Sequence, residues 1–272
     1  MRKLSWSKNR RLGQHFLNNK KILEEMARAA KISKQDIVLE VGPGMGSLTE
    51  ILAARAKKVI AVEKDRELIP VLREKFKDFK NMEIIEGDVL KIFNFQFPIF
   101  NKFKNFKVVA NLPYYITSRF LRLFLSETKF RSKLIVLMVQ KEVAERICAK
   151  PPRMNLLALS VQAYAEPEII RYVSKNFFSP PPKVDSVIIK ITPLIPLTLR
   201  GKAKKSSPLK VRGAGGVMGV EKILAVAKIA FQQKRKMLRH SIGKKITLPE
   251  KYQNKRPEEL SLKDWAEILR YN

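Results

Sequence analysis

One stretch decides the fold of this chain: Asp36-Ile-Val-Leu-Glu-Val-Gly42-Pro-Gly44-Met-Gly46-Ser-Leu-Thr49. It is typical of an apolar strand, a turn with three alternating glycines and the start of a helix. Glycine lets the backbone turn tightly and approach a ligand closely, which is how doubly wound α/β folds form a nucleotide crevice at the carboxyl ends of their strands. We therefore expect Gly42, Gly44 and Gly46 to lie beside a cofactor.

Three further strand-like runs end in polar side chains. The run Val59–Val62 ends at Glu63, about twenty residues after the glycine turn, where a carboxylate can accept both ribose hydroxyls of a nucleoside. The next run ends at Asp88, which could accept a hydrogen bond from an exocyclic adenine amine. The run Lys107–Ala110 ends at Asn111. The polar ends of four successive strands predict one cofactor crevice.

A dinucleotide-dependent oxidoreductase is the obvious alternative. Its fingerprint is G-x-G-x-x-G, whereas this chain has glycines at alternate positions 42, 44 and 46, preceded by Glu40. The spacing disfavours a nicotinamide cofactor.

The tetrapeptide Asn111-Leu112-Pro113-Tyr114 follows the fourth strand. An amide, a turn fixed by proline and an aromatic ring offer an acceptor for an N–H group and a face for a flat base. Taken alone, the tetrapeptide would be an ordinary turn between a strand and a loop. Beside the predicted crevice, it favours a site that positions an amino nitrogen for methylation.

The rest of the chain alternates between two patterns. Strand-like runs at 37–41, 59–62, 82–86, 107–110 and 134–139 alternate with helical patterns at 18–30, 47–56, 65–76, 118–126 and 141–149. Such alternation predicts a parallel sheet. Two later runs, Leu159–Ala165 and Val184–Ile191, have no long helix between them, so we expect them to pair antiparallel at the sheet edge and to complete seven strands.

We expect three parts along the chain. Residues 1–195 would form the cofactor-binding domain with a basic N-terminal arm. Residues 196–219 hold four Lys, two Arg and five Gly with few large apolar side chains, which predicts a flexible basic insertion or linker. Residues 220–272 begin with an amphipathic helical pattern and would form a small helical domain.

The charge predicts a polyanionic partner. The 55 Lys and Arg residues outnumber the 25 Asp and Glu residues, which gives a formal net charge of +30. Residues 1–23 and 228–249 each hold seven basic side chains and no acidic one, so both blocks resemble phosphate tracks. In the second block we expect RNA contacts from Lys234, Arg235, Lys236 and Arg239.

Composition excludes several other classes. Cys148 is the only cysteine, so an intramolecular disulfide and a cysteine zinc cluster are excluded, and two histidines cannot form a histidine-rich metal site. We expect no metal. No signal-type apolar stretch and no run of about 18 apolar residues occur, so we expect a cytoplasmic protein without membrane spans.

At these motifs the sequence closely resembles the ribosomal RNA adenine dimethylases, enzymes that use S-adenosylmethionine to dimethylate adenine N6 in small-subunit rRNA. The resemblance covers nearly the whole chain. Its motifs are Glu40–Gly46, Asn111–Tyr114, Arg11-Leu-Gly-Gln-His-Phe-Leu17, Phe178-Ser-Pro-Pro-Pro-Lys-Val-Asp-Ser186, Ala230–Arg239 and Pro257–Leu262. It implies a Rossmann-like class I methyltransferase sheet of seven strands with a small C-terminal helical domain.

The resemblance also implies a cofactor and its contacts. The cofactor is S-adenosyl-L-methionine, and Gln14 is expected near its methionine end. The other implied contacts are His15, Leu17, Gly42, Glu63, Asp88 and Asn111. Two departures from the family pattern stand out: Leu156-Leu157 replaces a common Tyr-Gly, and residues 196–219 are inserted between the domains.

The implied reaction is N6,N6-dimethylation of two adjacent adenines in a loop near the 3′ end of 16S rRNA, within small-subunit biogenesis. We expect the Asn111 side-chain oxygen and the Leu112 carbonyl to orient the amine, and Tyr114 and Phe178 to stack on the base. Phe178 could instead belong to the core, since one of the pair Phe177 and Phe178 can face inward. His15 is expected to contact the cofactor rather than act as a base.

The expected partner is small-subunit rRNA or the assembling 30S subunit, bound by a monomer. Two alternatives share the fold: a large-subunit rRNA adenine methylase of the macrolide-resistance type, and a non-catalytic RNA-binding assembly factor. A DNA adenine methylase would more commonly have Pro in place of Leu112 and a separate target-recognition domain.

Overall fold

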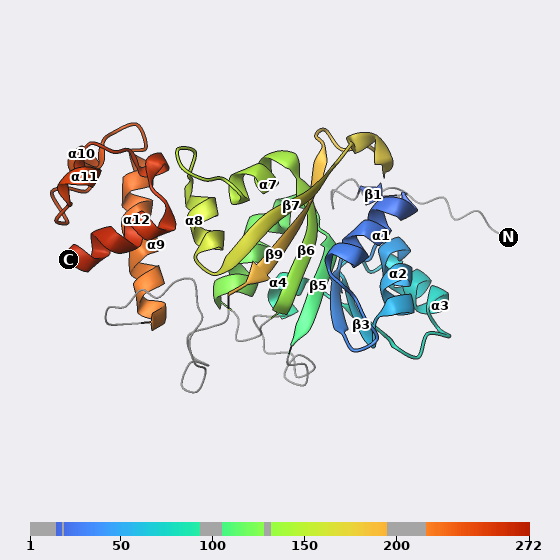
Figure 1. The fold of residues 1–272 in the computed structure, drawn as a ribbon. Coiled ribbons are helices and arrows are strands. Elements are labelled where there is room, and N and C mark those ends of the chain that lie inside the picture. Colours follow the sequence, from blue (N-terminus) through green and yellow to red (C-terminus); the bar gives the residue numbers. More distant parts are fainter. Residues whose placement is uncertain (1–14, 18, 93–104, 128–131, 195–215) are drawn as a thin grey trace. The chain divides into compact units, whose positions relative to one another are not determined.

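The computed structural model describes residues 15–17, 19–92, 105–127, 132–194 and 216–272 (Figure 1). The chain divides into two compact units. The first unit contains the described residues up to Ala144 and those of Glu168–Pro193. Glu145–Pro167 and the described residues from Leu194 to Asn272 belong to the second.

A seven-stranded sheet forms the centre of the first unit, as the alternating pattern predicts. Its order is β4-β3-β2-β5-β6-β9-β7. The first five strands in that order are parallel, whereas β9 runs antiparallel to β6. The strands are β2 (Ile37–Val41), β3 (Lys58–Glu63), β4 (Met82–Glu86), β5 (Phe106–Asn111), β6 (Ser132–Gln140), β7 (Ala165–Val173) and β9 (Ser186–Pro193).

Helices alternate with the parallel strands. They are α1 (Lys20–Ala29), α2 (Ser47–Arg55), α3 (Leu68–Lys75), α4 (Val89–Ile92), α6 (Thr117–Arg122), the π-helical turn η3 (Leu123–Glu127) and α7 (Lys141–Ile147). The side chain of Asn19 accepts a hydrogen bond from the Ile22 backbone amide at 3.2 Å and caps α1. One face of α1, including Met26, is buried together with α2 residues such as Leu52 and with Val109 of β5.

A second, two-stranded sheet ties the N-terminal segment to a distant part of the chain. In it β1 (Phe16–Leu17) pairs antiparallel with β8 (Phe178–Ser179), and Leu17 lies opposite Phe178. Both of these side chains are buried in the core of the first unit. The pairing therefore fixes Phe16 and His15 beside the main sheet.

The expectation of a strand over residues 159–165 is wrong. The structure has helix α8 (Leu156–Gln162) there, and the missing strand is β7. The side chain of Asn155 caps α8 by accepting from the Ala158 backbone amide at 3.0 Å. A short apolar run fits either a strand or a buried helix, and the cap decides between them. The charged and proline residues that hid β7 are typical of an edge strand.

The second unit is helical, and it is larger than the sequence predicts. Its helices are α8, α9 (Gly216–Gln232), α10 (Leu238–Ser241), α11 (Glu250–Gln253) and α12 (Leu262–Ile268). Leu159 of α8 and Ala227 of α9 are buried in one cluster with Trp265 of α12. Residues 145–167 therefore belong to this unit, and not to the first domain as predicted, because their apolar face is completed by the C-terminal helices.

The expected linker, residues 196–219, falls mostly outside the described residues. Its last residues, from Gly216, already belong to α9, so this helix begins before the predicted Val220. Throughout the described ranges, no helix has the length and apolar character that a membrane span requires.

Candidate active site

The glycine turn after β2 adopts the conformation that its sequence predicts. Gly44 and Gly46 have positive φ angles of 59° and 78°, a region that side chains with a Cβ rarely occupy. A Cβ atom on Gly44 would lie 3.0 Å from the Phe16 ring, and one on Gly46 would lie 2.6 Å from the Phe76 ring. Both positions therefore require glycine, and the turn keeps its backbone close to the neighbouring aromatic rings.

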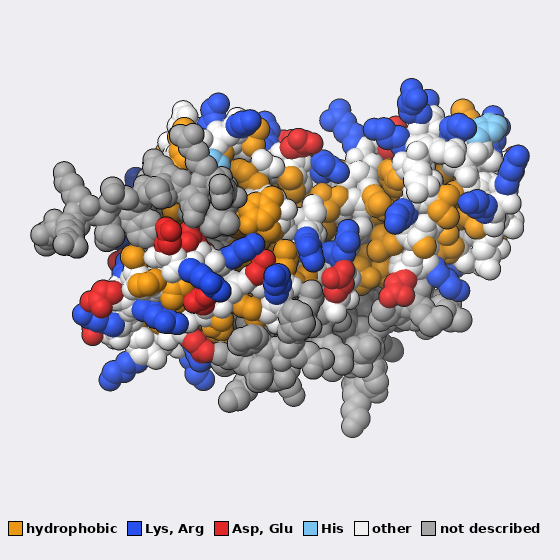
Figure 2. Space-filling model, turned by 180° about the vertical axis from the view of Figure 1, so that it is seen from behind, with side chains coloured by type: hydrophobic (Ala, Val, Ile, Leu, Met, Phe, Trp, Pro, Cys, Tyr) orange, Lys and Arg blue, Asp and Glu red, His pale blue; other side chains and the backbone are white. Residues whose placement is uncertain are grey.

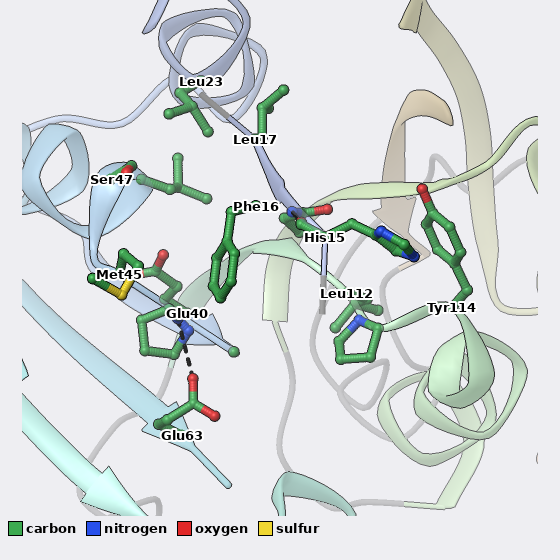
Figure 3. A pocket seen from close by; sticks show the side chains of 16 residues that line it. His15, Phe16, Leu17, Leu23, Glu40, Met45, Ser47, Glu63, Leu112 and Tyr114 are labelled. Atoms are coloured by element: carbon green, nitrogen blue, oxygen red, sulfur yellow. Dashed lines mark hydrogen bonds between the residues drawn. The ribbon is translucent and has the colours of Figure 1, made fainter. Parts of the chain in front are cut away.

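An open cavity lies where β2 and β5 end, with about 760 Å³ of space free of protein atoms when the open solvent at its mouth is included (Figure 3). Its wall combines the N-terminal segment, the glycine turn and the Asn111–Tyr114 tetrapeptide. The lining residues are His15, Phe16, Leu17, Leu23, Glu40, Gly42, Pro43, Gly44, Met45, Ser47, Leu48, Glu63, Asn111, Leu112, Pro113 and Tyr114. Most of the residues predicted from the sequence are thus brought together.

Glu63 ends β3 and holds the glycine turn. One carboxylate oxygen accepts from the Gly44 backbone amide at 3.1 Å, and the other accepts from the Lys64 and Asp65 amides at 2.8 and 2.9 Å. Burial raises the pKa of the Glu63 carboxyl, and these three donors oppose the shift. A carboxylate has about four lone-pair sites, so limited capacity remains for a ribose hydroxyl.

Asp88 lies at the same sheet edge but does not line the cavity. One of its oxygens caps α4 by accepting from the Leu90 amide at 3.0 Å, and the other lies 3.1 Å from the Lys64 ammonium group. Both oxygens therefore already have partners. Gly46 also lies outside the lining, because its turn faces the Phe76 ring. Gln14 lies outside the described residues.

Asn111 presents an acceptor at the cavity. Its side-chain nitrogen donates to the His15 carbonyl at 3.3 Å. A carbonyl can only accept, so this bond fixes which end of the amide is the nitrogen. Within the part of the chain that the structure describes, the Asn111 side-chain oxygen has no hydrogen-bond partner. The acceptor predicted from the sequence is therefore present.

Tyr114 is held from two sides. Its hydroxyl lies 2.7 Å from the hydroxyl of Ser186, the first residue of β9. Its ring stacks on the His15 ring, with 5.9 Å between centroids and 28° between planes. Nδ1 of His15 lies 2.8 Å from the Pro180 carbonyl and donates to it. Burial raises the pKa of the Tyr114 phenol, against the effect of the Ser186 hydrogen bond.

The expectation that Phe178 stacks on the base is not met by its position. Phe178 is 4% exposed, belongs to the core and does not line the cavity. Its pairing with Leu17 directs the ring inward, so the neighbouring Phe177 is the one that is exposed, at 40%. Phe177 ends the short 3-10 turn Lys175–Phe177, outside β8, and its side chain stays at the surface.

The basic residues expected to contact RNA belong to the second unit. All four are exposed: Lys234, Arg235 and Lys236 lie between α9 and α10, and Arg239 lies in α10. Figure 2 shows Lys and Arg side chains spread over one face of the molecule, with fewer Asp and Glu among them. Among the described residues, no cluster of three or more His, Cys, Asp or Glu could hold a metal ion.

Sequence reasoning gave no site role to Glu40 or Ser186. Glu40 is buried yet lines the cavity, and burial raises its pKa to about 8. Its Oε2 atom has no partner in the described part of the chain. A carboxyl side chain near the end of an apolar strand, two residues before Gly42, was the available signal. Ser186 lacked such a signal, because its role depends on Tyr114, 72 residues earlier.

Comparison with known proteins identifies the family. A model of the family described as ribosomal RNA adenine dimethylase matches residues 6–203, which is most of the chain. The chain belongs to this family. Its members are methyltransferases, so the predicted family and enzyme class are confirmed.

Two similar relatives carry the name ribosomal RNA small subunit methyltransferase A. The one from Clostridium botulinum (strain Okra / Type B1) is 46% identical over 199 residues, 72% of this chain and 71% of the relative. The one from Dehalococcoides mccartyi (strain CBDB1) is 49% identical over 187 residues, 69% of this chain and 62% of the relative.

Two solved structures share the family fold across both units. A dimethyladenosine transferase from Plasmodium falciparum has a TM-score of 0.73 at 28% identity, covering 94% of this chain and 96% of that chain. The 23S rRNA methyltransferase ErmE has a TM-score of 0.70 at 22% identity, covering 94% and 98%. The second similarity shows the fold alone, and together they confirm the α/β class with a C-terminal helical region.

The family implies a methyl donor of the S-adenosylmethionine type. Such a donor carries an ammonium group, ribose hydroxyls and a positive sulfonium, so its site must supply hydrogen-bond acceptors. The cavity does so, because Asn111 keeps an acceptor oxygen without a partner among the described residues, and the carboxyl groups of Glu40 and Glu63 also line it. The residues therefore fit the group.

Proposed function

We propose that this chain uses S-adenosyl-L-methionine to dimethylate N6 of two adjacent adenines, in a loop near the 3′ end of small-subunit rRNA. The modification would belong to small-subunit biogenesis, and a cytoplasmic monomer would carry it out. The observation that carries the proposal is the Asn111 oxygen, which remains available to accept at the cavity beside the Tyr114 ring.

The chain's own residues must prepare a poor nucleophile. The lone pair of an exocyclic adenine amine is delocalised into the ring. When the Asn111 oxygen and the Leu112 carbonyl each accept one N6 hydrogen, the nitrogen becomes more tetrahedral and its lone pair turns out of the ring plane. Bound S-adenosylmethionine supplies the electrophilic methyl group. Holding the reactants in this geometry can contribute roughly 7–11 kcal/mol. After transfer the nitrogen is positively charged and loses its proton readily to water, so no strong base is needed.

The target adenine must leave its stack to reach the cavity, at a cost of a few kcal/mol. Tyr114 receives the base on one face, and stacking on an aromatic ring contributes about 1–3 kcal/mol. The Ser186 hydroxyl and the His15 ring keep the Tyr114 ring in place. Phe178 supports the site from the core, since it could stack on a base only by leaving the pairing with Leu17.

The cofactor would be held mainly by the residues that line the cavity. His15, Leu17 and the turn at Gly42 would contact it on one side, and Glu63 would accept from its ribose. We expect a smaller contribution from Asp88, because Leu90 and Lys64 already engage its two oxygens. No step of the reaction uses a metal.

The RNA would be held mainly through phosphates. Exposed Lys234, Arg235, Lys236 and Arg239 can neutralise backbone charge on the rRNA or the assembling 30S subunit, independently of base sequence.

The substrate class can be tested directly. Purified protein is incubated with labelled S-adenosylmethionine and with separated small-subunit rRNA, large-subunit rRNA, assembled small subunits and DNA. We expect N6,N6-dimethyladenine at two adjacent positions in small-subunit rRNA, mapped by nucleoside and fragment mass spectrometry. Label in large-subunit rRNA or DNA alone would contradict the proposed substrate, and no label with any of the four would contradict the enzyme activity.

A further inference from the structure

Residues 172–184, the joining segment from the end of β7 to the residues just before β9, carry exposed apolar side chains that we call the patch. Tyr172 near the end of β7 is 53% exposed, Phe177 is 40% exposed, and Val184 just before β9 is 43% exposed. Seven large apolar side chains are exposed to this degree in the described part of the chain, and three of them lie on this segment. Three such side chains so close together along the chain make this segment a candidate interaction site.

Lysines surround these side chains. The Lys141 ammonium group lies 5.7 Å from the centroid of the Tyr172 ring. Lys175 and Lys183 on the joining segment are exposed. The acids closest to these lysines in sequence are Glu142, which follows Lys141, and Asp185, which already accepts from the Lys175 backbone amide at 3.0 Å. Arg171 forms an ion pair with Glu25 and does not add to the excess of positive charge.

The patch is fixed to the residues that position Tyr114. The carbonyl of Asp185 accepts from the Lys141 backbone amide at 3.0 Å. The next residue, Ser186, pairs with Gln140 across the strands and holds the Tyr114 hydroxyl at 2.7 Å. All of these residues belong to the first unit, and the joining segment lies beside β1 at one end of its sheet (Figure 1). The patch and the cavity therefore share one rigid support.

The chemistry of the patch favours RNA over protein. Lysine is depleted in the buried centres of protein interfaces. Separate aromatic rings interspersed with lysines are typical of surfaces that stack single-stranded bases and neutralise their phosphates. A base can stack on any of these rings without a sequence-specific contact.

We propose that Tyr172 and Phe177, flanked by Lys141, Lys175 and Lys183, bind an unpaired nucleotide next to the adenine that enters the cavity. The inference rests on the proposed function, because it assumes a single-stranded RNA target. The proposed nucleotide contact would hold the RNA on the side of the cavity opposite the glycine turn. This is the side on which β6, β9 and β7 lie in the sheet.

Binding to RNA oligonucleotides of increasing length tests the proposal. The oligonucleotides contain one target adenine and zero to four unpaired neighbours on either side, and fluorescence anisotropy at fixed salt gives Kd. Tyr172→Ala and Phe177→Ala should each weaken binding of the longer oligonucleotides by about five- to 150-fold, the range for loss of one base–aromatic stack. Neither substitution should affect the oligonucleotide without neighbours.

Tyr271→Ala is the matched control, since Tyr271 is a similarly exposed aromatic in the second unit. It should bind like the wild type, and thermal melts of all variants should show unchanged folding. Wild-type affinity of Tyr172→Ala and Phe177→Ala for every length would overturn the proposal. So would a loss confined to assembled subunits, which would assign the patch to a ribosomal protein.

Methylation of rRNA by the wild type is scored in parallel. Its absence would refute the proposed function, while the length dependence of binding would still decide whether the patch takes a nucleotide.

Discussion

Two hydroxyl groups, those of Tyr114 and Ser186, decide how the aromatic face of the cavity is presented. Ser186 is fully buried, and its partner at 2.7 Å is the Tyr114 hydroxyl. A tyrosine ring that is anchored at its hydroxyl loses the freedom to rotate away from an incoming base. Ser186 is therefore a positioning residue, because it acts through Tyr114.

This role predicts a coupling between the two residues. Ser186→Ala should lower kcat more than it changes KM, by about five- to tenfold, which corresponds to a hydrogen bond of ~1 kcal/mol. In the Tyr114→Phe background, Ser186→Ala should cause little further loss, because the bond is already absent. Steady-state kinetics of the wild type, Ser186→Ala, Tyr114→Phe and the double variant give the coupling free energy between the two residues. Fully additive losses would show that Ser186 acts independently of Tyr114.

A second residue, Glu40, should make stability depend on pH. Burial raises the pKa of its carboxyl group from the ordinary value of 4.5 to about 8. The folded protein therefore binds the proton more tightly than the unfolded chain does. The stabilisation from protonated Glu40 is complete below pH 4.5 and is lost as the pH rises through about 8.

Thermal melts between pH 5 and about 9 should show this contribution. In Glu40→Gln, which keeps the size but cannot ionise, Tm should fall less with rising pH than in the wild type. Glu50→Gln is the control, since Glu50 lies exposed on α2. Parallel pH profiles of wild type and Glu40→Gln would mean that Glu40 is not protonated in the folded state.

At the scale of elements, the sequence predicted what local patterns determine. The glycine turn, the five parallel strands and the helices between them follow from periodicity and from residues with special backbone angles. Helix α8 was missed because the signal that marks it is its cap, Asn155, and not an apolar period. Strand β7 was missed because it lies at the sheet edge, where few apolar residues are needed. The choice between Phe177 and Phe178 depends on strand register with β1, which no local pattern reveals.

That register makes a prediction about stability. Phe178→Ala should destabilise the protein by roughly 3–5 kcal/mol, the usual cost of emptying a buried phenylalanine site. Phe177→Ala should change stability by about 0.5 kcal/mol or less, as at other exposed positions. Urea or thermal denaturation of the two variants provides the comparison. Equal losses, or a greater loss for Phe177→Ala, would contradict the inward position of Phe178.

For the whole molecule, the sequence predicted the class of partner correctly from composition, but it did not predict correctly where the chain divides into two units. The charge of +30 indicated nucleic acid without any knowledge of the fold. The division was mispredicted because Leu159 belongs to the cluster around Trp265, and a contact between residues so distant in sequence leaves no local signal. For the same reason, the sequence could not show that Asp88 is engaged by Lys64.

The charge makes a prediction about RNA binding. Replacing Lys234, Arg235 and Lys236 together by Gln should reduce the slope of log K against log salt by up to about three units, if each contacts one phosphate. Replacing Lys57, Lys80 and Lys91, which are exposed in the first unit, makes the same charge change and is the control. A triple variant at 234–236 that keeps the wild-type slope would place the phosphate contacts elsewhere.

In the proposed mechanism the Asn111 oxygen orients the adenine amine, and the methylation state of reacted rRNA shows whether it does so. Wild type, Asn111→Ala and the exposed control Asn254→Ala are incubated with small-subunit rRNA and S-adenosylmethionine, and nucleosides are quantified by mass spectrometry. We expect N6,N6-dimethyladenine from the wild type and the control. Asn111→Ala should give neither monomethyladenine nor dimethyladenine while retaining RNA affinity, because phosphates dominate binding. Wild-type dimethylation by Asn111→Ala would contradict the account.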